Sequence, residues 1–421
     1  MIDTQILLPG VTLRCCRDTR FKQGCLSFQM VRQMDREESA LNALLPSVLL
    51  RGTARCPDLR SITEHLDELY GASVSPLVRR IGDYQTTGLY CGFMDDRFAL
   101  PGDQVLKPML AFLEEVLLDS PLENGAFLPS FVESEKKNLI ATIESELNDK
   151  RVYAMNRLLR IMCSADTFGL PRLGDKEQVA AITPRSLYSH YRNILRSSPI
   201  EIFYVGSAEP WQVAQMLMPL LGKLDRDVQG LAAQMPFQTC EGQTVVENMD
   251  VSQGKLCMGF VTPITNRCPE FPVMQIMNTI LGAGMTSKLF VNVREKLSLC
   301  YSIGSGYYGT KGIVVISAGI DFDKEQLTRE EIMRQIDACR EGKITEQELR
   351  SAKEAILSSL RATHDSPGSI EGYYATAALS GLGMTPAVYM EKVEAVTLAD
   401  VVSCAKQLQL HTTYFLKGGS Q

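Results

Sequence analysis

Histidine and cysteine are the side chains of this sequence that could bind a transition metal, and their spacing offers such a site little. The four histidines are scattered along the chain: His65, His190, His364 and His411. No two cysteines have the Cys-x-x-Cys spacing, and Cys15 and Cys16 are adjacent, which does not suit chelation. The residues alone therefore predict no metal centre.

The twelve cysteines could also form a disulfide framework, but they are diluted over 421 residues. Several fall inside apolar runs, among them Cys91, Cys257, Cys300 and Cys404. Free cysteine is among the most buried residue types in proteins. We therefore expect buried free thiols rather than disulfide bonds.

The most distinctive run is residues 281–301, with the sequence LGAGMTSKLFVNVREKLSLCY. Its pattern predicts a glycine-bounded turn, a short helix and the beginning of a strand. A phosphate-binding loop would need a Gly-Lys-Ser/Thr tripeptide after the glycines, and this run has none. The run is thus not expected to hold a phosphate.

Length and composition indicate the number of domains, the binding partners that are excluded and the cellular compartment. A chain of 421 residues is longer than one hydrophobic core usually serves, so we expect two domains. The net charge of −6 argues against binding to nucleic acid or anionic lipid. The beginning of the chain lacks a signal-peptide pattern, and no run of 18 apolar residues occurs. We expect a cytoplasmic protein with no membrane contact.

The first half of the chain alternates strand and helix patterns. Strands are predicted at 12–16, 25–31, 73–79, 86–93 and 200–205, and helices at 39–50, 61–69, 105–117 and 129–150. A further short helix is predicted after Thr183, which is suited to an N-cap, and Pro184, which is suited to a first turn. Antiparallel strands with segregated helices make the predicted class α+β.

The second half repeats this order with small deletions. The offset between matching residues falls steadily, from 230 for Gly24 and Gly254, through 217 for Lys136 and Lys353 and 214 for Val179 and Val393, to 211 for Phe203 and Tyr414. Loop deletions in a duplicated unit would produce such a drift. We therefore expect two homologous α/β-sandwich units, residues 1–221 and 243–421, joined by a linker at 222–242 whose Gln- and Ala-rich sequence breaks the apolar periodicity.

Residues 281–301 resemble closely the C-terminal-half signature of the insulinase/pitrilysin-type metallopeptidases. Further resemblances are Arg51-Gly52-Thr53 after the first helix, Leu69-Tyr70-Gly71-Ala72 after the second, and a strand that ends in Val205-Gly206. The resemblance implies the fold of this family, in which four such units enclose a peptide in a chamber. The resemblance to the family covers most of the chain.

The family's chemistry depends on a His-x-x-Glu-His helix that binds zinc, with a second glutamate on a later helix as third protein ligand. Anchored on Arg51, this motif falls on residues 43–47, and every functional position has changed: Ala43 and Ser47 replace the histidines, and Pro46 replaces the general base. A proline inside a helix also removes a hydrogen bond, at a cost of about 3 kcal/mol. The first half is thus expected to lack the zinc motif.

The distal glutamate of the family maps to Thr142 when the alignment is anchored on Glu135 and Lys136. A slip of the alignment could select Glu144 or Glu146 instead, but one carboxylate without two imidazoles cannot complete the ligand shell. His65 lacks a second histidine four residues later and is expected to be a helix-surface residue.

A second functional element of the family, an arginine and a tyrosine seven positions apart that hold substrate near the zinc, matches Arg294 and Tyr301. Their guanidinium and phenol groups can donate to a peptide carbonyl and stabilise charge that develops there. Structural roles are the alternative, since an arginine at a helix end is usually solvated and a tyrosine at a strand start usually packs.

The resemblance therefore implies a non-catalytic subunit of a cytoplasmic heterodimeric metallopeptidase, in which Arg294 and Tyr301 bind peptide for a homologous zinc-bearing partner. Zinc is expected in the partner only, and the chain alone is expected to be inactive. The alternative is a structural or assembly protein with the same fold and no role in proteolysis. Hydrolysis by a different mechanism is a third, weaker possibility.

Overall fold

The computed structural model of the chain describes residues 2–238 and 241–418 and divides into two compact units. Unit 1 comprises Met1–Glu144, Pro171–Ala233 and His364–Leu379, and unit 2 comprises Ser145–Leu170, Gln234–Thr363 and Ser380–Gln421. One division between the units falls inside the expected 222–242 linker. Each unit also contains one segment from the other half of the sequence, which a contiguous division does not include.

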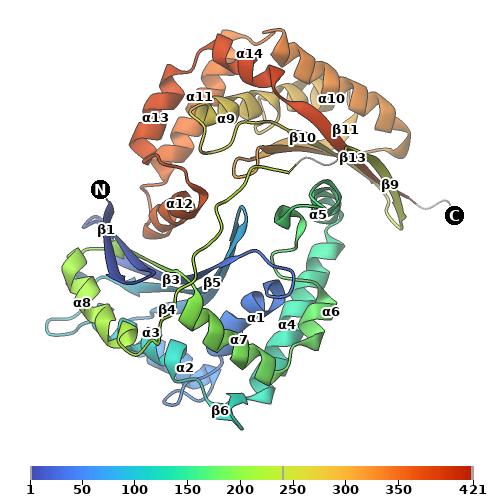
Figure 1. The fold of residues 1–421 in the computed structure, drawn as a ribbon. Coiled ribbons are helices and arrows are strands. Elements are labelled where there is room, and N and C mark those ends of the chain that lie inside the picture. Colours follow the sequence, from blue (N-terminus) through green and yellow to red (C-terminus); the bar gives the residue numbers. More distant parts are fainter. Residues whose placement is uncertain (1, 239–240, 419–421) are drawn as a thin grey trace. The chain divides into compact units, whose positions relative to one another are not determined.

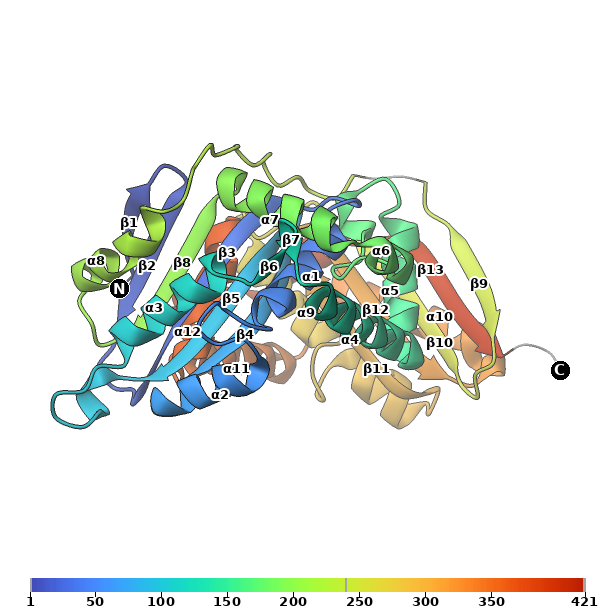
Figure 2. The ribbon, with the colours of Figure 1, turned by 90° about the horizontal axis from the view of Figure 1, so that it is seen from below.

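Unit 1 is built on a six-stranded sheet in the order β1-β2-β8-β3-β5-β4 (Figures 1 and 2). Its strands are β1 (Ile2–Leu8), β2 (Val11–Arg17), β3 (Gln23–Gln33), β4 (Ser73–Ile81), β5 (Tyr84–Met94) and β8 (Ile200–Gly206). Strands β2 and β8 are parallel, and the other neighbours are antiparallel. The strand β1 was not among the predicted elements.

Helices cover one face of this sheet and supply most of the core of unit 1. They are α1 (Ser39–Leu49), α2 (Leu59–Glu68), α3 (Leu106–Leu118), α4 (Pro129–Asn148), α6 (Lys176–Ala181), α7 (Pro184–Ser197) and α8 (Pro210–Leu221), with the small hairpin β6 (Leu122–Glu123) and β7 (Ala126–Phe127) between α3 and α4. From β3, Leu26, Phe28 and Met30 belong to this core. Side chains alternate along a strand, so Cys25, Ser27 and Gln29 lie on the opposite face.

That opposite face is covered by α12 (Pro367–Ser380), a helix from the second half of the sequence. Ile370 of α12 packs with Cys25 and Val205 in a small apolar cluster. Beside it, the buried carboxylate of Glu371 accepts hydrogen bonds from Ser27 Oγ at 2.7 Å and Gln29 Nε2 at 3.1 Å. A buried carboxylate is tolerated where its oxygens are satisfied in this way.

The positive charge that balances Glu371 comes from β4. Arg79 donates through both terminal nitrogens, at 2.9 Å to Oε1 and 2.7 Å to Oε2. The Glu371 side chain is 0% exposed and that of Arg79 is 29% exposed. This two-point contact is a strong form of ion pair and fixes α12 to the sheet of unit 1.

Unit 2 is built on a five-stranded sheet in the order β11-β12-β10-β13-β9. Its strands are β9 (Thr244–Met249), β10 (Gly254–Val261), β11 (Cys300–Tyr308), β12 (Ile313–Ile320) and β13 (Gln409–Gly418). Read in reverse, the order and the strand directions match β2-β8-β3-β5-β4 of unit 1, including one parallel pair, β9 with β13. The predicted α+β class and duplication are confirmed.

The helices of unit 2 are α5 (Lys150–Met162), α9 (Phe271–Leu281), α10 (Glu325–Arg340), α11 (Glu346–Ala362), α13 (Pro386–Ala395) and α14 (Leu398–Lys406). The helix predicted at 129–150 ends at Asn148, because the side chain of Asp149 caps a new helix by accepting from the backbone N–H groups of Arg151 and Val152. That new helix, α5, was not predicted.

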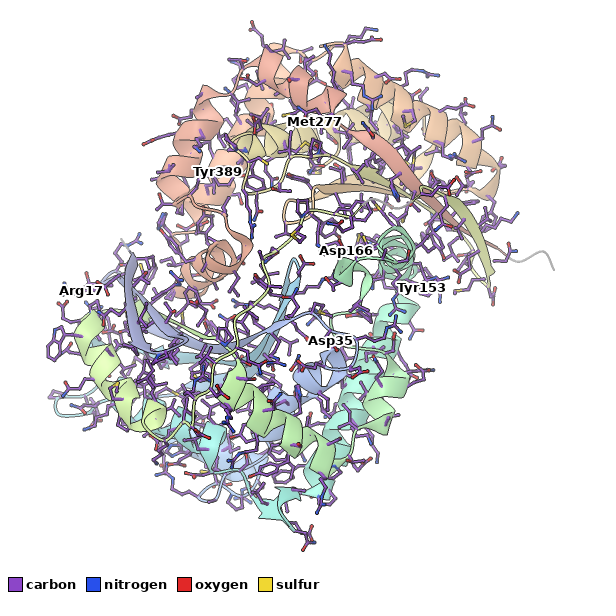
Figure 3. The ribbon with its side chains drawn as sticks, in the orientation of Figure 1. Arg17, Asp35, Tyr153, Asp166, Met277 and Tyr389 are labelled. Atoms are coloured by element: carbon purple, nitrogen blue, oxygen red, sulfur yellow. The ribbon has the colours of Figure 1, made fainter. Side chains whose placement is uncertain are left out.

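Helix α5 packs on the sheet of unit 2 through Ala154, Leu158 and Met162. It approaches β10 so closely that a Cβ at Gly259 would lie 2.6 Å from Met162 Sδ. After α5 comes Asp166, which is labelled in Figure 3. It forms a buried ion pair with Lys311 at 2.9 Å. Helix α5 follows α4 in the first half, and α12 follows α11 at the equivalent place in the second half. Each half of the sequence thus contributes one helix to the unit formed mainly by the other half.

The lysines matched by the duplication play the same part in both units. Lys136 donates from Nζ to the carbonyl of Ile182, the C-cap residue directly after α6, at 2.8 Å. Lys353 donates to the carbonyl of Glu394 near the end of α13, also at 2.8 Å. Both lysines thus satisfy a carbonyl at the end of a short helix, which is a favourable place for a positive charge.

Candidate functional site

The positions that the sequence comparison matched to the family's zinc motif, residues 43–47, lie on α1. Ala43 and Pro46 are buried, and Ser47 is partly buried. A methyl group, a proline ring and a hydroxyl cannot replace the two imidazoles and the general base of that motif. These residues do not fit a zinc ion, so no catalytic step through zinc can be derived for this chain.

Helix α1 continues through Pro46, whose missing N–H leaves the carbonyl of Asn42 without its usual partner in the helix. The hydroxyl of Thr87 on β5 donates to this carbonyl at 2.7 Å. On the other side of the proline, the N–H of Leu50 donates to the Pro46 carbonyl at 3.2 Å. The sheet therefore supplies the hydrogen bond that the helix lacks.

The side chain of Asn42 joins a buried polar network. It donates from Nδ2 to Gln85 Oε1 at 2.9 Å, and its Oδ1 accepts from His190 Nε2 at 2.7 Å. Gln85 in turn donates to the carbonyls of Ser39 and Arg172. Amide and imidazole hydrogen bonds thus join α1 to β5 and α7, next to the degenerate motif.

His190 gives this network a measurable pH dependence. Burial lowers the pKa of its imidazole from 6.5 to about 4. Between these values the unfolded chain binds a proton that the native chain does not, so stability is retained above pH 6.5 and falls as the pH is lowered toward 4. We expect a contribution of up to about 1.4 kcal/mol per pH unit. Urea unfolding of the wild type and of His190→Gln, each at pH 7.5 and 5.5, measures this contribution. The variant should lose less stability between the two pH values than the wild type. Equal losses would contradict a buried neutral imidazole.

Thr142 lies on α4, where it is exposed and donates from Oγ1 to the carbonyl of Asn138 at 2.9 Å. Glu144 is exposed as well and lies 3.8 Å from Lys176. His65 lies on α2 with its ring 4.9 Å from that of Phe112. Within the described residues, no three His, Cys, Asp or Glu side chains are placed to hold a metal ion.

Arg294 lies near the end of the helix predicted between the glycine turn and the strand. This helix, Leu289–Lys296, is π-helical, and the N–H of Leu297 donates five residues back to Asn292 at 3.2 Å. The exposed guanidinium lies over the ring of Phe290, 4.7 Å from its centroid. Among the described residues it has no ion-pair partner. Wide helical turns are rare and occur frequently at functional sites.

The chain reverses at Ser298, which has a left-handed backbone with φ of 47°. This conformation is uncommon for a residue other than glycine. Two hydrogen bonds hold the reversal, from Ser298 N–H to the Arg294 carbonyl at 3.1 Å and from Leu299 N–H to the Val293 carbonyl at 3.0 Å. The reversal leads directly into the edge strand β11.

Tyr301 occupies an irregularity at the start of β11. Cys300 pairs with Ile320 of β12 and Ser302 pairs with Gly319, so Tyr301 is an extra residue in the ladder. Such β-bulges redirect a side chain and are common beside active sites. Tyr301 is 60% exposed and donates from its phenol to Asp321 Oδ1 at 3.0 Å.

Arg294 and Tyr301 line one surface pocket of about 320 Å³ in unit 2, together with Ser298, Asp321 and Lys324. Lys324 lies 3.0 Å from Asp321 Oδ2. The hydrogen bond to Lys324, and then that to Tyr301, lowers the pKa of the Asp321 carboxyl, and the bond to Asp321 raises the pKa of the Tyr301 phenol. The tyrosine therefore stays protonated and able to donate.

The glycine turn contacts the π-helix and the strand β11, the two elements that carry Arg294 and Tyr301. A Cβ at Gly282 would lie 2.7 Å from Leu289 Cδ1 and from Ser305 Oγ, so only glycine allows the turn to touch both the π-helix and β11. Lys288 anchors the start of the helix through Glu348 at 2.8 Å. The predicted pair thus shares one site, whereas the bulge, the π-helix and the Asp321 contact gave no signal in the sequence.

Two duplicated α+β units, the second with a pocket lined by Arg294 and Tyr301, are the arrangement that the resemblance to the peptidase family predicts. A family model described as "Peptidase M16 inactive domain" matches residues 181–356. The chain is 29% identical over 409 residues to the Bacillus subtilis (strain 168) protein named "Probable inactive metalloprotease YmfF", covering 97% of this chain and 96% of that protein.

Solved structures show the same fold. A conserved protein from Enterococcus faecalis V583 is 25% identical and superposes with a TM-score of 0.93, covering 100% of this chain and 99% of that one. A peptidase M16 inactive domain from Pseudomonas fluorescens is 16% identical and shares the fold, with a TM-score of 0.82 over 100% of this chain and 98% of that one. The chain is therefore similar along its whole length to M16 peptidases, the insulinase/pitrilysin type, and in particular to relatives described as inactive.

One further property follows from the helices. Among the described residues, no helix combines the length and the apolar character needed to cross a membrane.

Proposed function

We propose that this chain is the non-catalytic subunit of a cytoplasmic heterodimeric metallopeptidase. A homologous partner supplies the zinc, and this chain supplies Arg294 and Tyr301 as peptide-binding groups. The observation that carries the proposal is the shared pocket of the two residues, in a chain whose own zinc positions are Ala43, Pro46 and Ser47.

The chemistry of the pocket suits a peptide backbone. The exposed guanidinium of Arg294 can donate to a peptide carbonyl, and the phenol of Tyr301 can do so by exchanging its hydrogen bond to Asp321 for one to the peptide. The adjacent strand β11 is at an edge of its sheet, where β12 is its one neighbour among the described strands. An extended peptide can add to such an edge through main-chain hydrogen bonds, with little demand on its sequence.

A structural or assembly protein is the second candidate. It is supported by the contacts that both residues already make within the chain, Arg294 over Phe290 and Tyr301 to Asp321. These contacts account for the two side chains without any substrate. In that case the pocket would stabilise the start of β11 and would have no role in proteolysis.

Coexpression tests the proposal. The chain and a zinc-bearing M16 homologue from the same cell should elute together and cleave an unstructured peptide in a chelator-sensitive reaction. Each chain alone should be inactive or much less active. Co-elution without any gain in cleavage would favour the assembly protein, and separate elution would contradict the heterodimer.

Zinc content provides an independent prediction. The purified chain should hold no stoichiometric zinc and show no chelator-sensitive peptidase activity, because Ala43, Pro46, Ser47 and Thr142 provide no ligand set. Elemental analysis of tag-free protein, dialysed against zinc-free buffer, checks this. About one tightly bound zinc per chain would show that another ligand set exists.

A further inference from the structure

A second pocket, of about 510 Å³, lies on unit 1. Its lining residues come from the end of α3, the short strand β6, α7 and the segment after α8. These elements are labelled in Figure 1. The residues that line the pocket are Leu118, Ser120, Leu122, Tyr188, Tyr191, Arg192, Asn193, Leu195, Arg196, Lys223, Leu224 and Asp225. A volume of this size is typical of small-ligand sites.

One part of the pocket is apolar. Leu118, Leu122, Leu195 and Leu224 contribute aliphatic side chains. The ring of Tyr188 stands edge-on to Phe127, with 5.3 Å between centroids, which fixes its orientation. This wall can remove a short aliphatic group from water.

The other part is positively charged. The lining contains three cations, Arg192, Arg196 and Lys223, and one anion, Asp225, on a chain whose net charge is −6. Two of these cations have partners: Arg196 lies 3.9 Å from Asp225, and Lys223 pairs with Glu114. Within the described part of the chain, Arg192 has no ion-pair partner.

Ser120 adds a second polar group without a partner. Its Oγ is buried and makes no hydrogen bond to the described residues. Buried polar atoms are nearly always hydrogen-bonded in native proteins, so such an atom at a pocket needs an explanation. The neighbouring phenol of Tyr191, in contrast, is satisfied by the carbonyl of Leu117.

We propose that this pocket binds a carboxylate attached to an aliphatic group. The planar guanidinium of Arg192 presents two donors that match the two oxygens of a carboxylate, and a small side-chain shift that opens Ser120 Oγ to the pocket would let its hydroxyl donate to the same head group. The leucine wall holds the aliphatic part. A fatty acid and the free C-terminus of a peptide ending in leucine share this chemistry, and the site is separate from the pocket of Arg294 and Tyr301.

Calorimetric titration of the full chain tests the site with four probes: octanoate, octanol, acetate and a short peptide ending in leucine, the last as free acid and as amide. Octanoate or the peptide acid should bind at least about tenfold more tightly than octanol, acetate or the peptide amide, since charge and apolar wall both contribute. The tighter of the two identifies the source of the ligand. Equal binding of octanol and octanoate, or binding of no probe, would overturn the proposal.

Variants localise the binding. Arg192→Gln should weaken the binding of octanoate or the peptide acid by about ten- to a hundredfold. Ser120→Ala should weaken it less and provides a second test if the arginine variant folds poorly. The matched control is Arg185→Gln, an exposed arginine on the same helix that does not line the pocket. A loss in the control equal to that in Arg192→Gln would show that general charge attraction is responsible.

Discussion

Replacing Arg294 by alanine should lower kcat/KM of the assembled peptidase by about 10²–10³, with assembly and partner zinc content unchanged. The loss of one donor to a developing oxyanion typically has this effect, and a donor that only positions the substrate has a smaller one. The expectation rests on a guanidinium that has no ion-pair partner among the described residues and shares a pocket with Tyr301. Steady-state kinetics of the purified complex measure it.

Two further variants separate function from structure. Tyr301→Phe keeps the ring at the bulge and removes only the hydroxyl, so it should lower the rate without lowering the melting temperature. Lys296→Ala is the control, since Lys296 lies on the same π-helix but does not line the pocket. Full activity in both Arg294→Ala and Tyr301→Phe would leave the assembly protein as the better account.

Replacing Glu371 by alanine should lower the free energy of unfolding by about 3 kcal/mol. The change leaves the guanidinium of Arg79 without the carboxylate that it contacts at two points. It also removes the acceptor of the hydrogen bonds from Ser27 and Gln29. Removing one partner of a buried ion pair is strongly destabilising. Because α12 is fixed to the sheet through this carboxylate, the helix should also become more accessible to protease. Urea unfolding and limited proteolysis measure the two effects.

The control is Glu354→Ala, which removes an exposed carboxylate 3.9 Å from Arg361 and should change stability by less than about 0.5 kcal/mol. The double variant Glu371→Leu with Arg79→Met should recover part of the loss, because an apolar pair leaves no buried charge unpaired. A small loss in Glu371→Ala, equal to that of the control, would mean that the apolar contacts of Ile370 hold α12 without the ion pair.

The sequence was sufficient to predict the repeated architecture. Drifting matches such as Gly24 with Gly254 correspond to strands β3 and β10, which have equivalent places in the two sheets. Apolar alternation marks strands and caps such as Thr183 mark helix starts, because both depend on local chemistry. Arg294 and Tyr301 were singled out by the family resemblance rather than by local chemistry, and a single turn brings them to one pocket.

Features that depend on distant contacts could not be predicted. Helices α5 and α12 were not among the predicted elements, and nothing local shows that each packs on the sheet of the unit formed mainly by the other half. The carbonyl of Asn42 is satisfied by Thr87, a residue 45 positions away. His190 was set aside as one of several scattered histidines, although it completes a buried network with Asn42 and Gln85.

The most direct test of the central claim is the peptidase rate of the complex isolated from a native lysate through a tag on this chain, measured with and without a metal chelator. A non-catalytic subunit should bring down a homologous chain that carries zinc, and the isolated complex should cleave an unstructured peptide until the chelator is added. A tagged chain that is isolated alone, or with unrelated proteins and no chelator-sensitive cleavage, would contradict the proposal that this chain binds peptide for a zinc-bearing partner.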